Sequence, residues 1–223
     1  MGFFTRKQRV RLDTFCADFY DKQILSPVIA GVDAGRTYFE TVMRAVAEVD
    51  KTLAVVDCDR FFSEMTLIRF EVFGLAWHHQ LGDKHAAAQS AYTKTYLEQR
   101  GQEDIWANLE PYNQAIARSS TMGQTSETPT GRAYLTFVNK MRADLFDHWD
   151  KQGFEPDAVA RAANRISTDV AWDKGITAAF LMLTLCNRLG CELNEEGQSR
   201  LIAVIRGLYD GVRETMRQVK VEA

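Results

Sequence analysis

Residues 59–81 carry the sequence feature that most restricts the fold of this chain. Between Met65 and Trp77, nine of the thirteen side chains are apolar, and at helical spacing they cover most of the circumference of a helix. A helix on the surface of a globular protein has one apolar face, so a helix that is apolar nearly all round is buried on several sides. We therefore expect residues 59–81 to form the centre of a helical bundle.

The rest of the chain shows the same helical spacing of apolar residues. With only 4 prolines and 14 glycines in 223 residues, turn residues are too few for an all-β sandwich. The sequence predicts an all-α fold, a single multi-helix bundle of about seven to nine helices, with helix in about 60 % of the residues or more and no sheet. Further helices are expected at residues 12–26, 34–56, 83–100, 104–109, 130–151, 156–189 and 194–220.

Several helix ends can be placed from single residues. Asn194 is a suitable N-cap for the last helix, because its side chain can accept a hydrogen bond from the first turn. Gly101 and Gly190 suit helix C-termini, where a left-handed residue is common. Pro111 lacks a backbone donor, so one helix should end before it and another begin there. Gly175 is a possible bend.

One long internal loop is predicted from Ser119 to Gly131, where thirteen residues include a single apolar side chain. It would separate an N-terminal part, residues 1–118, from a C-terminal part, residues 132–223, of one helical domain, residues 1–223. A segment that buries so little should be the preferred site of limited proteolysis.

Charge and cysteine content exclude several classes of protein. The net charge is −3 and no basic stripe is interleaved with aromatic residues, so nucleic-acid binding is not expected. The four cysteines are scattered without a Cys-x-x-Cys pair, which argues against a zinc site or a disulfide framework.

The amino end lacks a secretory signal, and the longest nearly apolar run, residues 176–186, is about half of a membrane span. We therefore expect a cytoplasmic protein without a transmembrane segment.

The amino end also carries a short basic segment. Four positive charges in six residues would support weak contact with phosphates or an anionic lipid surface. The simpler interpretation is a solvated tail. The residues concerned are Arg6, Lys7, Arg9 and Arg11.

The most suggestive polar pattern lies in the expected central helix, where Glu64, Glu71 and His78 recur every seven residues and share one face. Seven residues rise about 10.5 Å, so no two of these side chains can bind one metal without ligands from another helix. Buried charges are normally paired, which favours ion pairs with Arg60 or with basic residues of neighbouring helices. The alternative is a ligand-binding or catalytic site in the bundle core.

A second pair, Asp144 and His148, stands four residues apart in an expected helix and suits either an ion pair or weak metal ligation. A divalent site needs three or four ligands, so a surface ion pair is favoured. The common nucleotide-binding, serine-hydrolase, zinc-protease and di-iron motifs are absent. No catalytic residue and no cofactor is therefore assigned.

These observations favour a binding or interaction protein over an enzyme. The alternative is a bundle-core enzyme, or a carrier of a small ligand or metal, that uses the polar residues of the expected central helix. The last helix has a second apolar line, Ile202, Tyr209 and Met216, at seven-residue spacing. This line predicts either a homodimer through the C-terminal helix or cover from another segment, such as the arm with Phe3 and Phe4.

Overall fold

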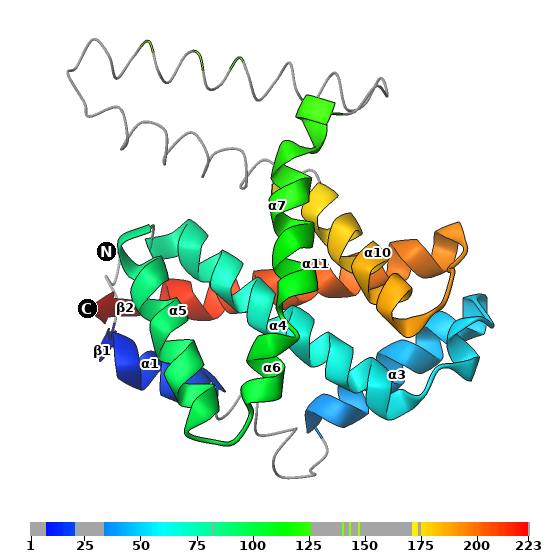
Figure 1. The fold of residues 1–223 in the computed structure, drawn as a ribbon, viewed down its shortest axis with the longest axis horizontal. Coiled ribbons are helices and arrows are strands. Elements are labelled where there is room, and N and C mark those ends of the chain that lie inside the picture. The colour runs from blue at the N-terminus through cyan, green and yellow to red at the C-terminus, as the bar shows by residue number, and fades with distance from the viewer. Residues whose placement is uncertain are drawn as a thin grey trace, which may run out of the picture. The chain divides into compact units, whose positions relative to one another are not determined.

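The computed structural model describes residues 8–20, 34–81, 83–125, 140, 143, 147, 171–173 and 175–222. Within these ranges it contains eight α-helices, one short 3-10 helix and two short strands (Figure 1). The all-α fold class is therefore confirmed. The helices are α1 (Leu12–Phe19), α3 (Ala34–Val49), α4 (Cys58–Leu81), α5 (Asp83–Glu98), α6 (Glu103–Ala107), α7 (Glu110–Thr125), α10 (Ile176–Leu189) and α11 (Glu195–Gln218), with the 3-10 helix η2 at Leu53–Val55.

The chain divides into two compact units. The first unit is discontinuous in sequence and consists of residues 1–110 and 185–223, while the second consists of residues 111–184. Helix α7 therefore belongs almost wholly to the second unit, and α10 passes from the second unit into the first at Leu185. These boundaries do not coincide with the expected division at residues 119–131.

Helix α4 is the centre of the first unit, as the sequence predicts. It packs against α11, α5 and α3, and it runs between α3 and α5 in Figure 1. Each large apolar side chain that is fully buried contributes about 1.5–3 kcal/mol to folding. The fully buried large side chains of α4 are Phe61, Met65, Ile68, Phe73 and Trp77.

Buried hydrogen bonds join the helices of this unit. His79 Nδ1 of α4 is hydrogen-bonded to the Tyr209 hydroxyl of α11. The hydroxyls of Tyr20 and Thr93 are bonded to each other, and Gln89 Nε2 donates to Tyr20 Oη across 2.8 Å. Buried polar groups need such partners, so these bonds help to fix α4 against α11 and the end of α1 against α5.

The ends of the chain form a feature that the sequence analysis did not predict. Strand β1 (Gln8–Arg11) pairs in parallel with β2 (Val219–Glu222), and Val10 lies opposite Val221. The expectation of no sheet is therefore wrong in this detail. β-Branched valines suit a strand, but four residues are too few for alternation to be recognised.

The capping predictions are confirmed where the residues are described. Asn194 Oδ1 accepts the backbone N–H of Gly197 across 2.8 Å at the start of α11. Gly101, Gly175 and Gly190 have φ values of 63°, 75° and 71°, in the left-handed region that favours glycine. Helix α6 ends at Ala107 and α7 begins at Glu110, so the chain restarts a helix next to proline as expected.

The predicted loop requires a correction. Helix α7 continues through Ser119 to Thr125, so the first half of the expected loop is helical. The Ser119 hydroxyl bonds to the Ile116 carbonyl across 2.7 Å and to Thr177 Oγ1 across 2.9 Å. Serine hydroxyls that bond to carbonyls of the preceding turn are compatible with a helix. Residues 126–131 and the expected helix at 130–151 lie outside the described chain, apart from isolated residues.

Candidate functional site

Glu64 is held in an ion pair. Its side chain is only 10 % exposed, and Arg188 Nε donates to Glu64 Oε2 across 2.6 Å. Arg188 comes from the part of α10 that belongs to the first unit, so both residues lie in one compact body. Arg60 does not provide this partner; it donates instead to the Arg188 carbonyl oxygen. Of the two pairings considered from the sequence, the one with a neighbouring helix is present.

Glu71 differs from Glu64. It is half-buried, and among the described residues it has no hydrogen-bond or ion-pair partner. Burial raises the pKa of Glu71 to about 8, and the nearby Glu110 carboxylate acts in the same direction. The ion pair expected for Glu71 is therefore not found in the described chain, and this carboxyl group is largely protonated at neutral pH.

His78 does not converge with the two glutamates. It is half-buried near the end of α4, and its ring centroid lies 6.0 Å from that of His79. Along the axis of α4, Glu64, Glu71 and His78 follow one another at steps of about 10.5 Å. Among the described residues, no group of three or more His, Cys, Asp or Glu residues is suited to hold a metal ion.

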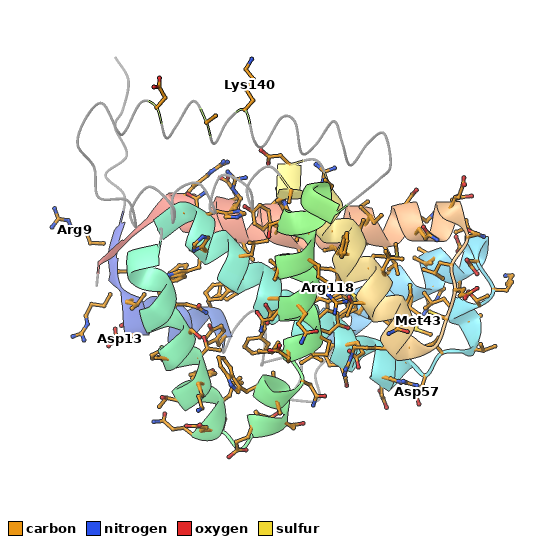
Figure 2. All side chains as sticks on the ribbon, turned by 45° about the horizontal axis from the view of Figure 1, so that its top comes forward. Arg9, Asp13, Met43, Asp57, Arg118 and Lys140 are labelled. Carbon is orange, nitrogen blue, oxygen red and sulfur yellow. The ribbon has the colours of Figure 1, made fainter. Side chains whose placement is uncertain are left out.

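The other candidate residues are mostly outside the described ranges. Asp144, His148, Arg6 and Lys7 cannot be placed. Arg9 and Arg11 are exposed on β1, and Arg11 Nη2 lies 3.0 Å from Asp13 Oδ2. Figure 2 shows Arg9 and Asp13 projecting outward at the margin of the first unit. Contact of this basic segment with an anionic surface stays a prediction.

A cavity of about 270 Å³ lies beside Glu64, between α4 and the α6 region, and we call it the α4–α6 cavity. Two of its hydroxyl side chains are engaged within α4: Ser63 bonds to the Asp59 carbonyl and Thr66 to the Phe62 carbonyl. The charge of Glu64 is matched by Arg188. The residues lining this cavity are Phe62, Ser63, Glu64, Thr66, Leu67, Gln102, Asp104, Ile105, Asn108 and Arg188.

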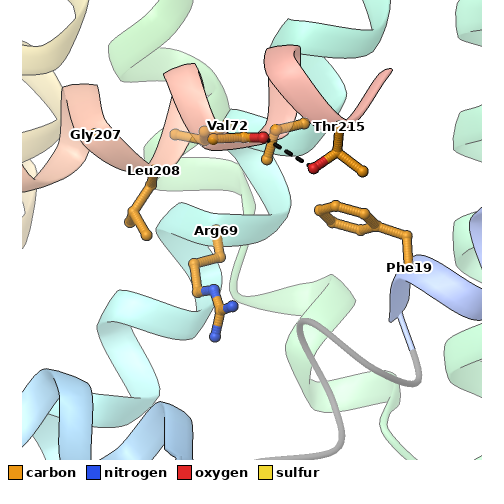
Figure 3. Close-up of a pocket in the computed structure, with 8 residues that line it drawn as sticks. Phe19, Arg69, Val72, Gly207, Leu208 and Thr215 are labelled. Carbon is orange, nitrogen blue, oxygen red and sulfur yellow. Dashed lines mark hydrogen bonds between the residues drawn. The ribbon is translucent and has the colours of Figure 1, made fainter. Parts of the chain in front are cut away.

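A second cavity of about 310 Å³ lies between α1, α4 and α11, and we call it the α11 groove. In Figure 3, Phe19 and Leu208 stand on opposite sides of it, α11 forms a third side and Arg69 lies on the fourth. The groove lies entirely within the first unit. Its lining residues are Phe19, Arg69, Val72, Gly207, Leu208, Gly211, Val212 and Thr215.

Arg69 is the only charged residue among those lining residues. It is half-buried on α4, and burial lowers the pKa of its guanidinium to about 10. The guanidinium carbon lies 5.5 Å from the centroid of the Phe39 ring. Within the described chain, no carboxylate and no hydrogen-bond acceptor is bonded to Arg69.

Sequence reasoning missed this site. Arg69 interrupts the apolar run of the central helix, and Gly207 and Gly211 stand four residues apart within a helix that otherwise has a strong apolar stripe. Each signal is weak alone, because neither shows that α4 and α11 bring these residues together. Their juxtaposition appears only in the folded chain.

The structure removes the main reason for predicting a homodimer through the C-terminal helix. Tyr209 and Met216 are 1 % and 5 % exposed, and Tyr209 is bonded to His79 of the same chain. The seven-residue line is therefore largely covered within one molecule. Homodimerisation stays an untested prediction that no longer rests on these two residues.

The sequence matches no protein-family model, and no curated protein and no solved structure gave a significant match. Among the helices of the described residues, none is long and apolar enough to cross a membrane.

Proposed function

We propose that this chain is a non-catalytic binding protein that holds a small apolar molecule in the α11 groove. The observation that carries this proposal is the groove itself, a cavity of about 310 Å³ with apolar walls from three helices. This volume lies at the lower end of the range of small-molecule pockets. Leu208 and Val212 are only half-buried, so they still have apolar surface to offer to a ligand.

The two glycines of α11 support the same proposal. A glycine in a helix interior costs about 1 kcal/mol relative to alanine. A Cβ added at Gly207 or Gly211 would meet no described atom within 4 Å, so packing within the described chain gives no reason for either glycine. The absence of side chains there keeps the groove open along α11.

The lining residues argue for binding rather than catalysis. Thr215 donates its hydroxyl to the Gly211 carbonyl across 3.0 Å, and the other lining side chains, apart from Arg69, are apolar or absent. A site centred on Glu64 in the α4–α6 cavity is the weaker alternative, because Ser63 and Thr66 bond to carbonyls of α4 and Arg188 matches the charge of Glu64.

We also propose the cytoplasm as the compartment. All four cysteines are described and free, at positions 16, 58, 186 and 191. Free thiols persist in a reducing compartment, where disulfides are rare.

Calorimetric titration with 1-octanol tests the proposed function. We expect one binding site with a dissociation constant below about 1 mM. Gly211→Leu fills the groove and should abolish binding, whereas Ala203→Leu adds a similar side chain at an exposed position of α11 outside the groove and should leave it unchanged. Absence of binding to the unmodified protein, or equal binding by Gly211→Leu, would contradict the proposal.

A further inference from the structure

We infer that the ligand of the α11 groove is an aliphatic carboxylate, with its head group on the Arg69 guanidinium and its chain along α11. This inference rests on the proposed function, because it requires that the groove binds an apolar molecule. It adds the charge and the chemical class of that molecule.

Arg69 has no hydrogen-bond or ion-pair partner within the described chain. A guanidinium has five N–H donors and stays charged in proteins, and a partly desolvated charge without a partner is unfavourable. Within the described residues, the neighbours that favour the charged form of this group are the Phe39 ring, at 5.5 Å from the guanidinium carbon, and Tyr38. An aromatic face attracts the cation but accepts none of its five hydrogen bonds in the plane of the guanidinium. A carboxylate would accept two of them in a paired geometry.

The α11 groove has a charged side chain at one place and mainly apolar side chains elsewhere. The Arg69 guanidinium points away from α11, while Phe19 and Leu208 face each other across the groove (Figure 3). A molecule that fills the groove therefore meets apolar walls along most of its length and a positive charge at one end. This pattern is complementary to an amphiphile with one anionic head group.

The size and the charge of the α11 groove restrict the class of ligand that fits it. A volume of about 310 Å³ corresponds to about ten groups of the size of a water molecule, at about 30 Å³ each. Octanoate has about this size. The groove offers one cation and no second charged side chain among its lining residues, which suits a monoanion better than a phosphate dianion.

The test compares octanoate with 1-octanol, which has the same chain and no charge, by calorimetric titration at about pH 8, where a carboxylic acid is ionised. The unmodified protein should bind octanoate about tenfold or more tightly than Arg69→Met does, because a charge-assisted hydrogen bond is lost. Arg69→Met should weaken the binding of 1-octanol much less than that of octanoate, because 1-octanol carries no charge for the guanidinium to pair with. Arg44→Met, at an exposed position of α3 outside the groove, changes the net charge equally and should bind octanoate like the unmodified protein.

Two measurements keep the test decisive if Arg69→Met does not fold. Arg69→Lys keeps the charge but not the paired geometry, so its affinity for octanoate should fall more than its affinity for 1-octanol. In the unmodified protein, added salt should weaken octanoate binding more than 1-octanol binding. Equal affinities for the two ligands with no salt effect would overturn the carboxylate inference and leave the groove as an apolar site. Failure of both ligands to bind would overturn the proposed function, and the inference with it.

Discussion

Arg188 Nε donates to Glu64 Oε2 across 2.6 Å and so joins two residues that are 124 positions apart in the sequence. The Glu64 side chain is 10 % exposed and that of Arg188 is 26 % exposed. A carboxylate with so little contact with water depends on its partner. This pair therefore contributes to holding the C-terminal end of α10 against the N-terminal third of α4.

Arg188→Met should lower the free energy of unfolding by about 2 kcal/mol, because it leaves the Glu64 carboxylate buried without its cation. Urea denaturation measures the change. The control is Lys94→Met, which removes a 3.9 Å pair with Glu98 in which both side chains are about half exposed. An exposed pair of this kind contributes less than about 0.5 kcal/mol. If both variants lost a similar free energy of unfolding, burial of Glu64 would not be the cause of the effect of Arg188→Met.

Glu71→Gln should become progressively more stable than the unmodified protein as the pH rises. The pKa of Glu71 is raised from 4.5 to about 8 in the folded chain, so between these values the folded state keeps a proton that the unfolded state releases. The contribution of Glu71 is then fully favourable below about pH 4.5 and is lost as the pH approaches 8. We expect a gain of about 1–3 kcal/mol for Glu71→Gln near pH 8. Urea denaturation of both proteins between about pH 5 and 8 measures it. A variant less stable at every pH would instead indicate an ion pair at Glu71.

Gly207→Ala and Gly211→Ala should each raise the free energy of unfolding by about 1 kcal/mol, because alanine is the better helix former and the added Cβ meets no described atom within 4 Å. Both variants should also weaken the binding of 1-octanol, since the methyl group enters the groove. Thermal melting and calorimetry measure the two effects. Variants that bind the ligand as well as the unmodified protein would contradict the placement of the ligand along α11.

Gly197→Ala on the same helix is the contrasting case. A Cβ there would lie 3.2 Å from both Cβ and Oδ2 of Asp50, and Asp50 is held by hydrogen bonds from Thr52 and Asn194. We therefore expect no stabilisation from this substitution, despite the same gain in helix propensity. A melting temperature raised as much as in Gly207→Ala would show that Asp50 moves freely.

The four cysteines should differ in reactivity. Burial raises the pKa of the Cys16 and Cys186 thiols to about 12 and also raises that of Cys191, so little thiolate forms at neutral pH. Cys58 is half-buried at the first residue of α4. Iodoacetamide should label Cys58 first and the other three only after unfolding, as read by mass spectrometry of peptides. Early labelling of Cys16 would contradict the packing of α1.

The sequence correctly predicted the features of the fold that depend on residues within a single helix. The apolar run from Met65 to Trp77 identifies α4 as central because a helix without a polar face can only be buried. Asn194 marks the start of α11 because a cap bonds within its own first turn. The same reasoning was wrong for Ser119, whose hydroxyl is satisfied by Ile116 in its own helix and by Thr177, a residue 58 positions away.

The candidate site is formed by contacts between helices, and the spacing of residues along the sequence does not show which helices pack together. Glu64 and Glu71 occupy equivalent positions in the seven-residue pattern, yet one has an arginine partner and the other has none within the described chain. The difference arises from the helices that pack beside each turn. Arg69 is likewise distinguished by what surrounds it, since Phe39, Phe19 and Leu208 come from three other helices.

The location of bound octanoate tests the central claim most directly. Proton NMR of the complex should show nuclear Overhauser contacts from the octanoate methylene protons to the Hα protons of Gly207 and Gly211 and to the ring of Phe19, because these line the α11 groove. Contacts to Leu67 and Ile105 instead would place the ligand in the α4–α6 cavity and contradict the account. We expect the first pattern of contacts, with the carboxylate end of octanoate nearest to Arg69.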